Sequence, residues 1–439
     1  MRRLVVSLAL VVTLGVGPAA FGAPGDIFLV SSSDTGEAGN FESRVPDISV
    51  NGRIVAFQSS ATNLDPLDTD LFDDIYVKNL DSGEVTLASV APARSKGKGK
   101  GKGSAPVKGN LYSQRPSLSG DGSRVAFETG SSNLHPDDPF GGFDIYVKDL
   151  TSGDLTLASV NASGVKGNGY SVRPSISDDG TKVVFDSIAT NFSSQDADST
   201  FDVYVKDLVT GEVELVSVTS EGIKGNDVSF GAAISPDGTK VAFNSMATNL
   251  HPADTDHFTD VYVKDLVTGD LSLASTSDQG NSGNGASFGP QLTGDGSIVA
   301  FMSRATNLDP SDSQPYEDVY VKNLATGDLK LVSAAADGTK GNSLSFLGSI
   351  SPDGRLVAFD SISTNLHPAD PDSFDDVFLK DLTTGALTLI SSTAAGQKGN
   401  NASGGGSLSA DAGRIAFLTS ATNLHPSITG RTQIVVKEL

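Results

Sequence analysis

A repeat unit occurs seven times along the chain, and it limits the possible folds more than any other feature of the sequence. A phenylalanine that ends a Val-Ala-Phe-like segment marks each copy, and from Phe127 onward it recurs every 58 residues. The first interval is 70 residues because RSKGKGKGKGSAPVK (94–108) is inserted there. A period of this length indicates a repeat architecture in which each copy is one small structural unit. The marker residues are Phe57, Phe127, Phe185, Phe243, Phe301, Phe359 and Phe417.

Each copy predicts four short strands. In residues 234–276, a first strand ends at Ile234, and Pro-Asp-Gly (236–238) supplies a tight turn. Alternating β-rich segments follow at 240–245 and 260–266, and a Thr-Gly-Asp turn leads into 271–275. The unit is therefore predicted to be a four-stranded antiparallel meander.

The two ends of the chain complement each other. The last copy stops after its third strand, QIVVKEL (433–439), whereas IFLVSSSDTGEAGN (27–40) matches the fourth-strand segment 387–400. One sheet shared by both ends would close a ring and remove an open sheet edge. The sequence thus predicts an all-β, seven-bladed β-propeller that forms one domain over residues 24–439.

The N-terminal residues predict export. Arg2 and Arg3 precede an apolar run at 4–16 and then small residues, which is the pattern of a secretory signal over residues 1–22. The run is too short for a comfortable membrane span, and no integral membrane segment is expected in the mature chain. There is no cysteine, so disulfides and thiolate metal sites are excluded. We expect a periplasmic or secreted protein.

The charge limits the partners. A formal net charge of −22 repels nucleic acid and anionic membranes and attracts cations and basic groups. The Lys/Gly insertion at 94–108 is a basic exception. Its alternating glycines predict a flexible, solvated loop, and docking of an acidic partner is the alternative.

The connections between strands predict two unlike faces. First-to-second and third-to-fourth turns are short, whereas the second-to-third and fourth-to-first connections are long. Alternate connections of a meander lie at the same end, so one face of the ring carries all the long loops. Binding sites favour loops on a rigid scaffold, and we expect any recognition at this long-loop face and the channel mouth.

A Gly-Asn-x-x-Ser motif precedes every first strand on that face. Its asparagines and serines suit a hydrogen-bonded loop clamp. The functional alternative is a polar binding ring at the channel mouth. The pairs are Asn40/Ser43, Asn110/Ser113, Asn168/Ser171, Asn226/Ser229, Asn284/Ser287, Asn342/Ser345 and Asn400/Ser403.

An Asn-Leu dipeptide follows each second strand, with Asn191-Phe192 as the variant. Four histidines come directly after it, where other copies have aspartate or serine. Equivalent positions in different blades are far apart, so we expect loop packing and no shared metal ion. The histidines are His135, His251, His367 and His425.

An Asp-x-Asp-x-x-x-Asp motif leads into the third strand. Closely spaced carboxylates suit Ca²⁺, but the glycine and the distal glutamate of an EF-hand loop are missing. Aspartates that cap loop amides are the alternative. The complete motifs are Asp68/Asp70/Asp74, Asp196/Asp198/Asp202, Asp254/Asp256/Asp260 and Asp370/Asp372/Asp376, and partial ones are Asp138/Asp144 and Asp312/Asp318.

The segments ISPDGTKVAF (234–243) and DVYVKDL (260–266) resemble the WD40-like PD40 repeat of the TolB-like family of exported propellers. The resemblance covers nearly all of the mature chain, although Ser-Pro-Asp-Gly is intact only at 235–238 and 351–354. It implies an exported propeller that interacts with proteins. It does not imply a Tol–Pal role, because a shared fold does not assign a function.

The leading functional hypothesis is a non-catalytic, monomeric scaffold that binds a protein or an envelope polymer. An enzyme site normally makes one or two loops differ strongly from the rest, and here only the Lys/Gly loop does so. The sequence contains no HExxH, GxSxG or cysteine nucleophile. The alternatives are a calcium-dependent structural or surface propeller and, after it, a propeller lyase or hydrolase.

Overall fold

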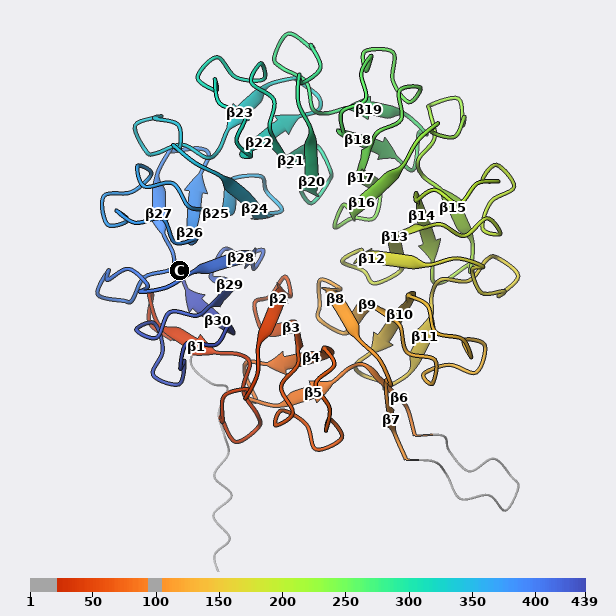
Figure 1. Cartoon of the computed structure of the whole chain (residues 1–439), viewed down its shortest axis with the longest axis horizontal. Coiled ribbons are helices and arrows are strands. Elements are labelled where there is room, and N and C mark those ends of the chain that lie inside the picture. The colour runs from red at the N-terminus through yellow and green to blue at the C-terminus, as the bar shows by residue number, and fades with distance from the viewer. Residues whose placement is uncertain (1–21, 94–104) are drawn as a thin grey trace, which may run out of the picture.

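The computed structural model describes residues 22–93 and 105–439 and contains only strands and turns in those ranges. Seven four-stranded antiparallel sheets stand around a central axis (Figure 1). This arrangement confirms the predicted all-β, seven-bladed propeller. Over the same ranges, no helix is long and apolar enough to span a membrane. The predicted signal segment and most of the Lys/Gly insertion, residues 94–104, lie outside the described residues.

The blades, numbered here in chain order, each run from an inner to an outer strand. Blade 1 consists of β2 (Ser43–Ile48), β3 (Ile54–Ser59), β4 (Asp74–Asn79) and β5 (Val85–Leu87). Blade 2 consists of β8 (Ser113–Leu118), β9 (Arg124–Thr129), β10 (Asp144–Asp149) and β11 (Leu155–Leu157). Blade 3 consists of β12 (Ser171–Ile176), β13 (Lys182–Ser187), β14 (Asp202–Asp207) and β15 (Val213–Leu215). Blade 4 consists of β16 (Ser229–Ile234), β17 (Lys240–Ser245), β18 (Asp260–Asp265) and β19 (Leu271–Leu273).

The remaining blades repeat this order. Blade 5 consists of β20 (Ser287–Leu292), β21 (Ile298–Ser303), β22 (Asp318–Asn323) and β23 (Leu329–Leu331). Blade 6 consists of β24 (Ser345–Ile350), β25 (Leu356–Ser361), β26 (Asp376–Asp381) and β27 (Leu387–Leu389). Blade 7 consists of β28 (Ser403–Leu408), β29 (Arg414–Thr419), β30 (Gln433–Glu438) and β1 (Ile27–Leu29). A separate ribbon, β6 (Val90–Ala91) with β7 (Val107–Lys108), flanks the Lys/Gly insertion.

The two ends of the chain meet in blade 7. Strand β1 pairs antiparallel with β30, with Phe28 opposite Val436. Figure 1 shows the red N-terminal strand beside the blue C-terminal strands. As a result, β30 has a pairing partner on each side.

The hydrophobic core lies between neighbouring blades. Within blade 4, Phe243 and Tyr262 are cross-strand partners whose rings stack 5.7 Å apart, and both are fully buried. They pack with Val184 and Val203 of blade 3 in one cluster. The Val-Ala-Phe and Asp-Val-Tyr-Val segments that recur in the copies thus provide the apolar side chains that pack adjacent sheets together.

Tight turns explain why one face of the ring has only short connections. Gly238 has a φ of +69° in the turn between the first two strands of blade 4, a conformation that favours glycine. Its backbone N–H donates to the Ser235 carbonyl at 2.8 Å. The Ser235 and Asp237 side chains hydrogen-bond within the same turn. These short turns leave the long connections together at the other end of the sheets.

Candidate functional site

The aspartates of the predicted Asp-x-Asp motifs converge in space. In blade 3, Asp196 accepts a hydrogen bond from the hydroxyl of Tyr204 at 2.6 Å, and Asp202 accepts one from Ser217 at 2.8 Å. Both aspartates are buried, and Asp198 is exposed. One carboxylate oxygen from each residue lies within 4.8 Å of the others in this cluster and in three more. The four clusters are Asp68/Asp70/Asp74, Asp196/Asp198/Asp202, Asp254/Asp256/Asp260 and Asp370/Asp372/Asp376.

A lysine ammonium lies among these carboxylates in most blades. Lys224, from the connection that leads to the next blade, places its Nζ atom 2.8 Å from Asp202, 3.0 Å from Asp198 and 3.6 Å from Asp196. The same contact, from lysine Nζ to Oδ2 of the aspartate that begins the third strand, is 2.7–2.8 Å long in five blades. The pairs are Lys108–Asp74, Lys166–Asp144, Lys224–Asp202, Lys340–Asp318 and Lys398–Asp376.

Burial and pairing act in opposite directions on these groups. Burial raises the pKa of Asp202 to about 6, although Lys224 pairs with its carboxylate and Ser217 donates a hydrogen bond to it. Burial by itself would lower the pKa of Lys224, but its contacts with Asp202 and Asp198 raise it above the ordinary value. Both groups are therefore charged at neutral pH, and each lysine compensates carboxylates that would be costly to bury alone.

Lys108 is part of this arrangement. It ends β7, its side chain is only 9% exposed, and it contacts Asp68, Asp70 and Asp74. Although the insertion was predicted over 94–108, its last lysine is thus held in the cluster of blade 1. The sequence alone did not predict the contact of Lys108 with the aspartates, because Lys108 follows several other lysines from which it could not be distinguished.

Blades 4 and 7 lack the lysine. Ser282 takes its place in blade 4, and the bridge Thr276↔Ser282 matches Val218↔Lys224 in blade 3. Burial raises the pKa of Asp260 to about 7, only partly opposed by the hydrogen bond from Ser275. In blade 7 the charges are lost together: Ala38 occupies the lysine position, and Gln433 begins the third strand.

The Gly-Asn-x-x-Ser motif forms a clamp between the two long loops of each blade. In blade 4, Asn226 Oδ1 accepts from the backbone N–H of Thr248 at 3.0 Å, and its amide donates to the Thr248 hydroxyl at 3.2 Å. Asn249, from the Asn-Leu dipeptide, accepts from the backbone N–H of Asn226 at 2.9 Å and donates to the Lys224 carbonyl. The asparagine of the Gly-Asn-x-x-Ser motif and that of the Asn-Leu dipeptide therefore belong to one hydrogen-bonded clamp.

The serines of the motif are inaccessible. Ser229 is fully buried and shares a 2.9 Å hydrogen bond with Ser245 across the inner strand pair. Five of its counterparts at motif positions, Ser43, Ser113, Ser171, Ser287 and Ser345, are also fully buried, and Ser403 is 1% exposed. The structural alternative thus accounts for the motif, and the idea that these residues bind a ligand stays a prediction.

The four histidines after the Asn-Leu dipeptides cap local turns. His251 Nδ1 accepts from the backbone N–H of Ala253 at 3.2 Å. His135, His367 and His425 make the equivalent contact to the residue two positions on. Asp65 and Ser193 do the same in other blades. These hydrogen bonds confirm the predicted local role in the loops.

The central channel is lined by the inner strands, which are the least repeated part of the chain. Its cavity of about 540 Å³ includes Val45, Arg115, Arg173, Gly231 and Leu347 at one recurring position. Among the described residues that line it, none belongs to a Gly-Asn-x-x-Ser motif. Sequence comparison of the copies could have found this variation, since the seven inner strands are SRVPDI, SQRPSL, SVRPSI, SFGAAI, SFGPQL, SFLGSI and SGGGSL.

Hydrogen bonds from blade to blade shape the wall of the channel. A bulge in β12 gives Arg173 a φ of +55°, and its backbone N–H donates to Glu128 of blade 2 at 2.6 Å. The guanidinium group turns back to Asp186 at 3.1 Å and lies over the ring of Phe230. Asp186 in turn accepts from the Gly231 N–H at 2.8 Å. Charged groups of the wall are thus largely paired with each other.

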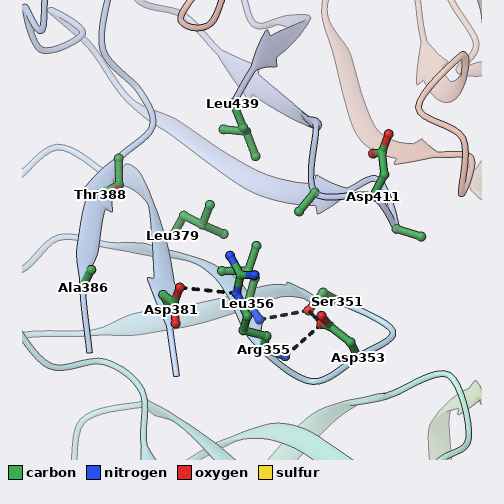
Figure 2. Close-up of a pocket in the computed structure, with 12 residues that line it drawn as sticks. Ser351, Asp353, Arg355, Leu356, Leu379, Asp381, Ala386, Thr388, Asp411 and Leu439 are labelled. Atoms are coloured by element: carbon green, nitrogen blue, oxygen red, sulfur yellow. Dashed lines mark hydrogen bonds and ion pairs between the residues drawn. The ribbon is translucent and has the colours of Figure 1, made fainter. Parts of the chain in front are cut away.

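A groove of about 420 Å³ lies on the short-turn face between blades 6 and 7 (Figure 2). Figure 2 shows that its polar groups interact among themselves: Arg355 pairs with Asp381 at 3.3 Å, and Ser351 donates to Asp353 at 2.6 Å. The Ser351–Asp353 contact recurs in the equivalent turns of other blades, and Arg53 and Asp81 form an ion pair like that of Arg355 and Asp381. The groove therefore offers no distinctive chemistry.

No protein-family model and no curated protein matches the chain, so the predicted membership of the PD40 family is not confirmed. Solved structures do match. TolB from Acinetobacter baumannii is 16% identical, with a TM-score of 0.43, over 77% of this chain and 63% of that one. The chain thus spans less than two thirds of that TolB structure.

Two other structures match over most of both chains. An oligogalacturonate lyase from Vibrio parahaemolyticus has 15% identity and a TM-score of 0.52, and the match covers 95% of this chain and 98% of that one. The β-propeller domain of the Trilobed protease from Pyrococcus furiosus has 12% identity and a TM-score of 0.54 over 90% and 95%. At such identities these similarities show the propeller fold alone.

Proposed function

We propose that this chain is an exported, non-catalytic propeller that binds a protein or an envelope polymer where its long-loop face meets the channel. The observation that carries the proposal is the distribution of differences among the blades. The loop clamps, the aspartate clusters and the outer strands repeat closely around the ring. The inner strands differ from blade to blade. If their role were only structural, we would expect them to repeat as closely as the outer strands.

The chemistry of the inner strands changes around the ring. Their second and third residues lie nearest the long loops. At the third position, which lines the cavity, blades 2 and 3 have arginine, blades 1 and 6 have valine and leucine, and blades 4, 5 and 7 have glycine: Arg115 and Arg173, Val45 and Leu347, and Gly231, Gly289 and Gly405. A wall with two arginines on one side and small or apolar residues at the same position elsewhere suits an oriented ligand, since a few placed polar groups and an apolar surface are typical of binding sites.

Capture from envelope extract tests the proposal. The immobilised mature chain is expected to retain a specific protein or polymer, and Arg115→Ser with Arg173→Ser should reduce that capture at least tenfold. Arg355→Ser, on the short-turn face, is the matched control and should leave capture unchanged. Equal capture by both variants, or no capture with or without calcium, would contradict the proposal.

Catalysis is the alternative that a further assay addresses. The oligogalacturonate lyase shares the fold, so oligogalacturonate is a sensible first substrate. We expect no turnover by the mature chain. Turnover that the two channel substitutions abolish, while Arg355→Ser retains it, would replace the binding proposal by an enzymatic one.

A further inference from the structure

The aspartate cluster of blade 4 differs from the other clusters in a single residue. Asp254, Asp256 and Asp260 lie as their counterparts do in blades 1, 3 and 6, with ligand oxygens within 4.8 Å of one another. The residue opposite them is Ser282, where each of those three blades has a lysine. The cluster thus keeps all three carboxylates without the ammonium group that accompanies them elsewhere.

The backbone places Ser282 where the lysines begin. The isolated bridge Thr276↔Ser282 corresponds to Val218↔Lys224, Ala334↔Lys340 and Ser392↔Lys398. From that point Lys224 extends its Nζ atom to 2.8 Å from Asp202 Oδ2. A serine side chain is three heavy atoms shorter and uncharged, so it cannot bring a positive charge to the aspartates.

Two buried oxygen atoms in this cluster have no hydrogen-bond partner among the described residues. One is Oδ2 of Asp260, a fully buried residue whose other oxygen accepts from Ser275. It corresponds to the aspartate oxygen that contacts the lysine in five blades. The other is the hydroxyl oxygen of Ser282. Unpaired buried polar atoms are costly, and a buried carboxylate without a countercharge more so.

We propose that Asp254, Asp256 and Asp260 bind one divalent cation, for which Ca²⁺ is the best match, at the place that a lysine ammonium takes in the other clusters and that Ser282 leaves open. Hard cations of this kind prefer carboxylate oxygens, and backbone carbonyls of a loop and water commonly complete the shell. Five blades show that this position takes a positive charge. Blade 4 supplies the carboxylates without that charge.

The proposal reduces the predicted calcium sites from four to one. In blades 1, 3 and 6 a cation would have to displace the ammonium groups of Lys108, Lys224 and Lys398, each of which contacts three aspartates. We therefore propose a calcium site in blade 4 alone. It does not depend on the binding function proposed above, since metal binding and partner capture are measured separately.

Calorimetric titration of the chelator-treated full chain with Ca²⁺ tests the proposal. We expect one equivalent to bind, with parallel titrations of Mg²⁺ and Na⁺ showing weaker binding. Ser282→Lys restores the residue of the other blades and should abolish binding while keeping or raising the Tm without calcium. Lys224→Ser should create a second site and raise the stoichiometry to two.

Several outcomes would overturn the assignment. Binding of no calcium by the wild-type chain would do so, and so would three or four equivalents, since the lysines would then not exclude the ion. Calcium binding that persists in Ser282→Lys would place the site elsewhere. Asp260→Asn offers a second check: it should weaken calcium affinity at least tenfold, with a folded chain verified by its cooperative melt.

Discussion

The ammonium nitrogen of Lys224 lies 2.8 Å from Oδ2 of Asp202, although the two residues belong to different loops of the long-loop face. The lysine lies on the connection to the next blade, and the aspartate begins β14. Because the same contact recurs in four other blades, it ties each blade to the segment that leaves it. The long loops are held by buried charge pairs as well as by the asparagine clamps.

Breaking one of these pairs should destabilise the chain. Lys398→Met leaves the buried Asp370 and Asp376 without a countercharge, and we expect the free energy of unfolding to fall by about 3 kcal/mol. Denaturant titration at neutral pH measures the change. Lys330→Met removes the same charge from an exposed position on β23 and should change stability by less than about 0.5 kcal/mol.

Replacing the whole cluster with its neutral counterpart should restore stability. Blade 7 has Ile428, Gln433 and Ala38 at the equivalent positions. We therefore expect Lys398→Ala combined with Asp370→Ile and Asp376→Gln to be at least about 2 kcal/mol more stable than Lys398→Met alone, because no buried carboxylate remains uncompensated. If the triple variant is as unstable as the single one, the charge argument is wrong.

The asparagine clamp should contribute locally. Asn226→Ala removes the acceptor of the Thr248 N–H and the donor to its hydroxyl, and we expect a loss of about 1 kcal/mol. Hydrogen exchange at the Thr248 amide should become faster while amides of β17 keep their protection. Asn281→Ala, at an exposed position in the equivalent connection one blade further on, between β19 and β20, serves as the control. Unchanged exchange at Thr248 would argue against the clamp.

A carboxylate on β25, next to the inner strands, should give the chain a measurable pH dependence. Burial raises the pKa of Asp360 to about 7, although the Gly405 N–H donates to it. The folded chain then binds more protons than the unfolded one between about pH 4 and pH 7, so this residue's contribution to stability falls as the pH rises through that range. Asp360→Asn should remove that decline, as seen in melts at several pH values.

The reciprocal substitution provides a matched comparison. Asn244 occupies the equivalent position in blade 4 and accepts from the Gly289 N–H at 3.1 Å, so asparagine fits this place. Asn244→Asp should therefore add a decline of stability with rising pH, by about 1.4 kcal/mol for each unit by which its pKa is raised. Identical pH profiles for all three chains would refute the assignment.

Removal of β1 should open the ring. A chain that begins at residue 34 loses the partner of β30 and leaves its backbone groups exposed, so we expect a lower Tm and association that grows with concentration. Light scattering after size exclusion measures that association. A chain that begins at residue 23 retains β1 and should remain as stable as the full one.

The repeat made the fold predictable. The interval between Phe243 and its neighbours defined the blade, and the short strand at each end of the chain placed the N-terminal segment beside the last blade. Strand bounds followed from alternation: the segment predicted at 240–245 is β17 (Lys240–Ser245). Such local signals suffice where every copy obeys the same pattern.

The site was less predictable because its partners are distant in sequence. Lys224 stands 26 residues after Asp198, so the motif alone showed carboxylates and suggested calcium. A signal was nevertheless present, since blade 7 loses its aspartates together with its lysine. The sequences of the inner strands also differ among the copies. This variation could be related to the channel only after the structure placed these strands at the cavity.

Gln433 has a consequence for how the two ends of the chain join. Its amide donates to the Gly39 and Phe41 carbonyls, and its oxygen accepts from the Ser31 hydroxyl at 2.6 Å, so one C-terminal side chain gathers three N-terminal residues. At the joint between the two ends of the chain, uncharged groups therefore take the place of the lysine–aspartate pair that five other blades have. Closure of the ring therefore does not depend on an ion pair at this position, and changes in ionic strength should affect the five blades with lysine–aspartate pairs more than this joint.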